Sequence, residues 1–131
     1  MMTEKHFKLT IGFNDPNLDK EELEQEAERL LGLLKEMDEV ESVSRVYDPH
    51  LPEGSKSVGG FIVGLLTAEV SVENCKRLLG FLGDRLGGKP IELEVEVEGK
   101  KLKVTAYSKE ELTVAVQAAQ DFVATKVTSY D

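Results

Sequence analysis

The most regular pattern of apolar and polar residues runs from Pro90 to Ala106. Apolar residues alternate there with Glu before the Glu98-Gly99 pair, and with Lys or Thr after it. An alternation with a period of two, interrupted by a two-residue turn, predicts a β-hairpin with one apolar and one charged face. The turn also fixes the cross-strand partners: Val95 with Leu102 and Leu93 with Val104 on the apolar face, and Glu96 with Lys101 and Glu94 with Lys103 on the charged face.

Two other segments have the composition of β-strands. From Phe7 to Phe13, apolar residues alternate with polar residues or glycine, which predicts a strand with one buried face. Residues 40–47 are rich in β-branched side chains and predict a second strand, although their alternation is imperfect.

Three segments carry apolar residues at helical spacing, each behind a residue whose side chain can cap the first backbone amides. These predicted helices and their capping residues are 19–37 with Asp19, 71–86 with Ser71 and 108–123 with Ser108. Glu111 completes a capping box with Ser108, which makes the third start the clearest of the chain. The helical pattern ends at Ala124, so we interpret 124–131 as a tail beyond a core of about 5–123.

Residues 58–69 form an apolar run with two possible interpretations. Its large apolar residues fit a helical template, whereas its three glycines disfavour a helix interior. We favour the helix slightly and keep a buried strand as the alternative.

Together these elements predict a single α+β domain over residues 1–131, a length typical of one domain. We expect a two-layer sandwich, with a mostly antiparallel sheet of three or four strands and three or four helices on its apolar face. A ferredoxin-like arrangement is a near relative, and a closer one if 58–69 is a strand.

Composition narrows the function classes. Hydrophobic residues make up 40% of the chain and charged residues 31%, as in folded proteins. The net charge of −9 argues against nucleic acid as a partner, because phosphate backbones attract the opposite charge. The longest apolar stretch is too short to span a bilayer, and the N-terminus has no apolar signal region. We therefore expect a cytoplasmic protein without a membrane partner.

Reactive side chains are few and scattered. Cys75 is the only cysteine and falls on the apolar stripe of its helix, so we interpret it as a core residue rather than a nucleophile paired with His6 or His50. The glutamates of the hairpin each face a lysine or solvent, which does not favour a catalytic carboxylate pair. We expect no catalytic residue, no metal and no cofactor.

The longest loop, Asp48–Ser57, contains two prolines, a glycine and a lysine. It lacks the residue order of a phosphate-binding loop, and a long loop with prolines is more often a shape feature or a docking surface. The predicted partner-contact residues are Pro49, His50, Pro52, Gly54 and Lys56.

The order of several motifs carries a family resemblance. These are the acidic helix ending in LLGLLKEM, the PEGSK loop, Gly59-Gly60, and the segments FIVGLLTAEV, CKRLLGFLGDRL, IELEVEVEGKKLKV and SKEEL. In this order the chain resembles the effector-associated constant component family, small α+β modules of bacterial conflict systems, from about Phe7 to Val123. It departs from the family pattern in two places: Phe81 stands where a tryptophan is often expected, and Lys56 is followed by serine rather than glycine.

The resemblance implies a non-enzymatic adaptor in a bacterial defence system. Its partner would be an effector, such as a peptidase or an NTPase-regulated toxin, or a regulator of that effector. Two alternatives stay open: a small-molecule-binding regulatory domain with ferredoxin-like topology, and an enzyme that uses the Asp48–Lys56 loop. The sequence also leaves a homo-oligomer open.

Overall fold

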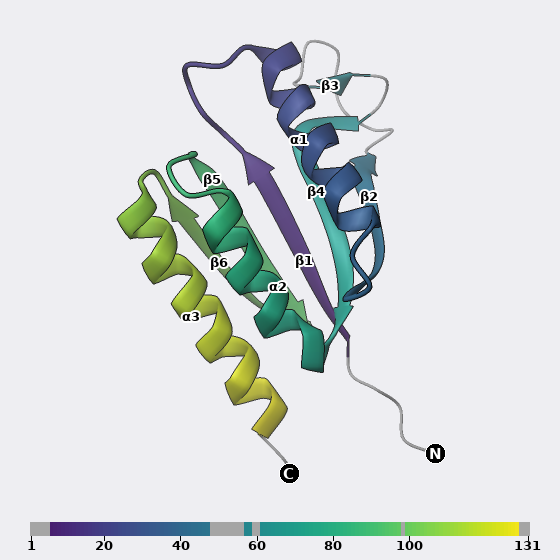
Figure 1. Cartoon of the computed structure of the whole chain (residues 1–131), viewed down its shortest axis with the longest axis vertical. Helices are drawn as coiled ribbons and strands as arrows, with labels where there is room; N and C mark the ends of the chain where they lie inside the picture. Colours follow the sequence, from purple (N-terminus) through teal and green to yellow (C-terminus); the bar gives the residue numbers. More distant parts are fainter. Residues whose placement is uncertain (1–5, 48–56, 59–60, 98, 129–131) are drawn as a thin grey trace.

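The computed structural model describes residues 6–47, 57–58, 61–97 and 99–128 (Figure 1). Its elements in chain order are β1 (His6–Phe13), α1 (Lys20–Lys35), β2 (Val40–Tyr47), β3 (Ser57–Val58), β4 (Phe61–Ser71), α2 (Val72–Arg85), β5 (Ile91–Val97), β6 (Lys100–Ala106) and α3 (Lys109–Thr128). Figure 1 shows the three helices on the same side of the sheet.

The sheet has the strand order β2-β4-β1-β5-β6, every neighbouring pair is antiparallel, and the short β3 pairs with β4. Because β4 lies between β1 and β2 and is antiparallel to both, β1 and β2 run parallel and are connected through α1. In the same way β1 separates the parallel strands β4 and β5, which α2 connects. The predicted α+β class is confirmed. The predicted strand number is too low, since the sheet has six strands in the described part of the chain.

The helix favoured for residues 58–69 is wrong, because this region supplies Val58 of β3 and most of β4. Leu66, Ala68 and Val70 are buried at alternate positions, as a strand beneath helices requires. Leu65 of β4 is apolar although it lies on the other face, beside Thr10 and Glu92, and this weakens the alternation that marks a half-exposed strand. Gly64 has a φ of +72°, and a Cβ there would lie 3.0 Å from the carbonyl oxygen of Phe13. Glycine is therefore required at this irregular point of the strand.

The hairpin prediction is confirmed residue by residue. β5 and β6 pair from Ile91 with Ala106 to Val97 with Lys100, in the register that the Glu98-Gly99 turn predicts. The charged face differs in detail, because the lysines contact the glutamates diagonally. Lys101 Nζ lies 3.5 Å from Glu94 Oε2, and Lys103 Nζ lies 3.8 Å from Glu92 Oε1.

The helix starts follow the predicted caps in two of three cases. Asp19 and Glu22 form a reciprocal capping box, in which the Glu22 N–H donates to Asp19 Oδ1 at 2.8 Å and the Asp19 N–H donates to Glu22 Oε1 at 3.0 Å. The Glu111 N–H donates to Ser108 Oγ at 3.1 Å. Ser71 lies at the N-cap of α2, but its side chain makes no capping hydrogen bond. α3 continues to Thr128, beyond the predicted end at 123.

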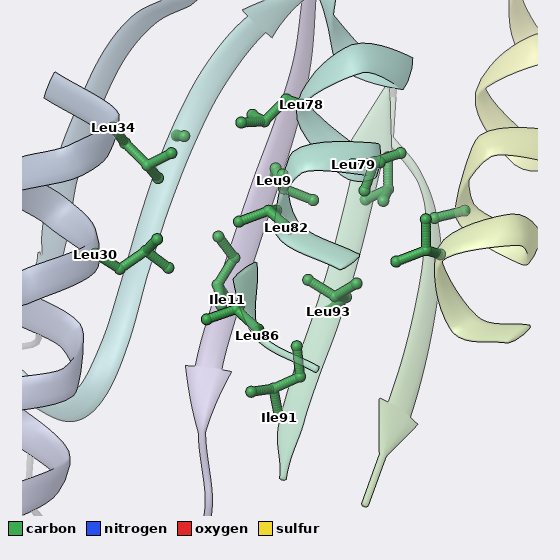
Figure 2. Packing of buried hydrophobic residues seen from close by; sticks show 14 of the residues in the cluster. Leu9, Ile11, Leu30, Leu34, Leu78, Leu79, Leu82, Leu86, Ile91 and Leu93 are labelled. Atoms are coloured by element: carbon green, nitrogen blue, oxygen red, sulfur yellow. The ribbon is translucent and has the colours of Figure 1, made fainter. Parts of the chain in front are cut away.

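A single hydrophobic core joins the helices to the sheet. Figure 2 shows leucine and isoleucine side chains of α1, α2, β1 and β5 pointing toward one another between the helices and the strands. Leu9, Leu34 and Leu82 are fully buried there. The opposite face of the sheet carries mostly polar side chains, such as Thr10, Glu94 and Lys103, with Leu65 of β4 as an apolar residue among them.

Candidate functional site

The predicted partner-contact loop lies outside the described residues. This applies to Pro49, His50, Pro52, Gly54 and Lys56 alike. Their role in partner contact stays a prediction, and the candidate site is built below from the rest of the chain.

Cys75 is not placed for nucleophilic chemistry. Its side chain is fully buried in the core, and burial raises the pKa of the thiol to about 12. A thiol with this pKa is protonated at neutral pH, whereas the thiolate is the nucleophile. His6 lies at the surface instead, with its Nδ1 2.9 Å from Glu41 Oε1 on β2.

Within the ranges that the structure describes, no cluster of three or more His, Cys, Asp or Glu side chains is placed to hold a metal ion. None of the helices described here has the length and apolar character needed to cross a membrane.

A nearly buried ion-pair cluster, which the sequence did not predict, lies under α1. The Arg45 side chain of β2 is only 5% exposed, and its guanidinium donates hydrogen bonds to both carboxylate oxygens of Glu24 and to Glu28 Oε2 at 2.8 Å. Arg45 Nε also donates to the Leu65 carbonyl oxygen at 2.9 Å, and the Gly64 N–H donates to Glu24 Oε1 at 2.9 Å. The cluster therefore connects α1 to β2 and β4.

Burial and hydrogen bonding shift the pKa values of Glu24 and Arg45 in opposite directions. Burial raises the pKa of Glu24, but the hydrogen bonds from Arg45 and Gly64 outweigh it, so the pKa of this carboxyl is lowered. Burial likewise lowers the pKa of Arg45, and the hydrogen bonds to Glu24 and Glu28 raise it overall. Glu24 and Arg45 are therefore both charged at neutral pH, and their hydrogen bonds join elements of the fold to one another. We assign this cluster a structural role.

An open apolar surface lies beside β6, the terminal strand of the described sheet. A groove of about 420 Å³ separates β6 from the first half of α3. Its lining residues are Val104, Thr105, Glu110, Glu111, Val114, Ala115 and Ala118. Val114 is 70% exposed and Tyr107, in the connection between β6 and α3, is 59% exposed. Figure 1 shows β6 and α3 together at one margin of the molecule. We call this surface the β6–α3 groove.

A second hollow, of about 490 Å³, lies where β1 ends and the chain turns toward α1. Phe13, Leu23 and Leu65 contribute apolar walls, and Asp15 and Glu92 contribute carboxylates. Asn14 also lines this hollow, and its Oδ1 is buried without a hydrogen bond from any described residue. Buried polar atoms normally have a partner, so this oxygen marks the hollow as a candidate ligand site.

Comparison with protein-family models, with curated proteins and with solved structures found no significant match for this chain.

Proposed function

We propose that this protein is a non-enzymatic interaction module that binds a partner protein at the β6–α3 groove. The observation that carries the proposal is an edge strand with no described partner on its outer side, next to an apolar groove. Edge strands present unpaired N–H and C=O groups, and natural proteins usually protect them. An apolar groove beside an edge strand can accept the side chains of a segment that pairs with this edge.

The family resemblance gives this module a biological setting. We propose that the partner is an effector of a bacterial defence system, peptidase-like or NTPase-regulated, or the regulator of that effector, and that the protein acts as its adaptor in the cytoplasm. The predicted loop of residues 48–56 would add a second contact.

We also propose that the core from β1 to β5 is ferredoxin-like and forms a two-layer sandwich. The support is its two β-α-β units, in each of which a strand of the other unit separates the parallel pair. β6 and α3 then form an addition to this core, and the β6–α3 groove belongs to the addition.

The test is the affinity of the purified protein for the effector encoded next to it in its source genome. Val114→Lys places a charge in the groove at an exposed position, so the fold is retained while affinity falls by about tenfold or more, which corresponds to about 1.4 kcal/mol. Thr113→Lys, the neighbouring exposed position outside the groove, is the matched control and leaves affinity unchanged. Equal affinities for the wild type and Val114→Lys would overturn the proposed surface.

A second candidate function is small-molecule binding at the hollow lined by Asn14. An acceptor oxygen beside two carboxylates favours a ligand that carries an amino group. Such a ligand raises the melting temperature of the wild type but not of Asn14→Ala, as measured in a thermal-shift screen of small amines and amino acids. A screen in which no amine stabilises the wild type would dismiss this candidate.

A further inference from the structure

We propose that the outer edge of β6 binds an extended partner segment in which acidic and apolar residues alternate, so that the segment becomes a further strand of the sheet. This inference rests on the proposed function, because it specifies the chemistry of the partner at the same surface.

The backbone of β6 is arranged to accept such a strand. β5 occupies one edge of β6, and no described strand occupies the other. In an antiparallel pair, alternate residues direct their N–H and C=O groups away from the partner, so the outer edge of β6 presents a row of these groups. An extended peptide satisfies them by strand addition, in which main-chain hydrogen bonds supply affinity and side chains supply specificity.

The lysines of β6 select acidic side chains on the face away from the helices. Lys101 and Lys103 are 57% and 61% exposed, and their contacts with Glu94 and Glu92 are 3.5 and 3.8 Å long. An ammonium group has three donors, so each lysine can also bind a carboxylate on a strand added at the outer edge. Opposite charges across neighbouring strands stabilise the pairing.

The groove selects apolar side chains on the face toward the helices. Side chains of a strand alternate between its two faces, so every second residue of the added segment points into the β6–α3 groove. Val104, Val114 and Ala118 supply its apolar surface. The volume of about 420 Å³ is large enough for several aliphatic side chains.

β5 shows what β6 accepts on its inner edge. Its sequence IELEVEV places apolar residues toward the helices and glutamates on the opposite face. The outer edge of β6 offers the same two environments to an added strand: the apolar groove on the face toward the helices, and Lys101 and Lys103 on the opposite face. The same alternation is therefore the complement of the outer edge.

A second copy of this chain fits the edge poorly. Antiparallel pairing of two β6 strands centred on Lys103 places this lysine opposite its own copy, and pairing centred on Leu102 places Lys101 opposite the partner's Lys103. Like charges that face each other directly across strands are destabilising. The other terminal strand, β2, offers Ser42 and Ser44 on the polar face rather than carboxylates. These two registers disfavour a second copy, so we take a different protein as the occupant and keep a dimer as an outcome of the test.

The test uses the full chain and two labelled peptides with polar flanks, one carrying IELEVEV and the other carrying lysine in place of each glutamate. Fluorescence anisotropy is expected to give an affinity for the acidic peptide at least about tenfold higher than for the basic one. The double variant Lys101→Glu with Lys103→Glu reverses this preference. The control variant Lys20→Glu with Lys35→Glu makes the same charge change at exposed positions of α1 and leaves the preference intact.

Backbone pairing and groove contact are tested separately. In an extended peptide every second N–H points toward β6 and the others point away. N-methylation of the amides that point toward β6 therefore abolishes binding, and N-methylation of the other amides does not. Val114→Lys weakens the binding of the acidic peptide, and Thr113→Lys does not. Circular dichroism of each variant checks that the fold is retained.

Several results would overturn the acidic-strand proposal. These are equal binding of the two peptides, an unchanged preference in the double lysine variant, and a dimer of the wild type that Val114→Lys dissociates. If the effector requires Val114 but the acidic peptide shows no preference, the docking surface stands and the partner chemistry is wrong. If the acidic peptide binds as expected but no effector does, the peptide proposal stands and the adaptor function is wrong.

Discussion

Two of the regions in which glutamates contact basic side chains, the β5–β6 hairpin and the cluster under α1, differ in burial. On the β5–β6 hairpin, Lys101 and Lys103 contact glutamates at 3.5 to 3.8 Å with more than half of each lysine side chain exposed. Under α1, the side chain of Arg45 is 5% exposed, and its guanidinium is bound by Glu24, Glu28 and a backbone carbonyl. Exposed pairs are screened by water and contribute little, whereas a buried charge that loses its partner is strongly destabilising. Because of this difference in exposure, the hairpin lysines can also bind a partner, whereas Arg45 has a structural role.

The largest expected effect comes from removing the buried cation. Arg45→Ala leaves Glu24 partly buried without its counter-charge and lowers the free energy of unfolding by about 3 kcal/mol. Urea denaturation measures this loss. The double variant Arg45→Met with Glu24→Gln removes both charges and recovers part of the stability. If Arg45→Ala loses no more free energy of unfolding than Lys101→Ala, the buried and the exposed ion pairs do not differ in their contribution to stability.

Gly64→Ala tests the backbone part of the Arg45 cluster. The positive φ disfavours alanine by about 1–2 kcal/mol, and the added Cβ would also lie 3.0 Å from the Phe13 carbonyl oxygen. Gly88→Ala is the matched control, because Gly88 also has a positive φ but a Cβ there would meet nothing within 4 Å. Thermal unfolding should place Gly64→Ala below Gly88→Ala. Equal melting temperatures would show that the contact with Phe13 relaxes freely.

The pH dependence of stability separates the two regions through Glu24. The pKa of this carboxyl is below its ordinary value of 4.5, so its stabilisation is complete above that pH and is lost as the pH falls through the lowered pKa. The wild type therefore loses stability more steeply than Glu24→Gln in acid below about pH 4.5. Urea midpoints measured from about pH 6 down to about pH 3, a range that includes the ordinary carboxyl pKa, check this. Parallel curves for the two proteins would contradict it.

The smallest effect is expected on the hairpin. Lys101→Ala lowers stability by about 0.5 kcal/mol or less, because the pair is exposed and held by a flexible side chain. High salt reduces the difference from wild type further, since it screens exposed charges. Urea midpoints at low and high salt measure both effects. If Lys101→Ala loses as much free energy of unfolding as Arg45→Ala, the hairpin lysines stabilise the fold rather than bind a partner.

Local features made part of this structure predictable. The register of the hairpin follows from a two-residue turn and an uninterrupted alternation, both of which lie within Pro90–Ala106. The caps at Asp19 and Ser108 are equally local, since each involves a residue three positions away. Ser71 had the right residue type and position, but its side chain makes no capping bond, so residue type alone did not decide the contact.

Long-range contacts limited the prediction elsewhere. The sequence favours a helix for most of β4 because Leu65 places an apolar residue on the face away from the helices, which obscures the alternation of a half-exposed strand. The Arg45 cluster joins residues 17 to 40 positions apart, and nothing near Arg45 in the sequence indicates its partners. The β6–α3 groove was missed for a related reason. The exposure of Val114 beside Val104 depends on how α3 packs on β6.

The sequence by itself determined the hairpin, its register and the start of two helices, because these depend on hydrogen bonds and alternation within a few residues. Only the tertiary structure decided which charges are buried and which are exposed. Sheet order brings Arg45 under α1 and leaves β6 at the edge, where its lysines keep most of their exposure. Burial is a property of packing between distant segments, so the difference between a structural ion pair and an available lysine is absent from the local sequence.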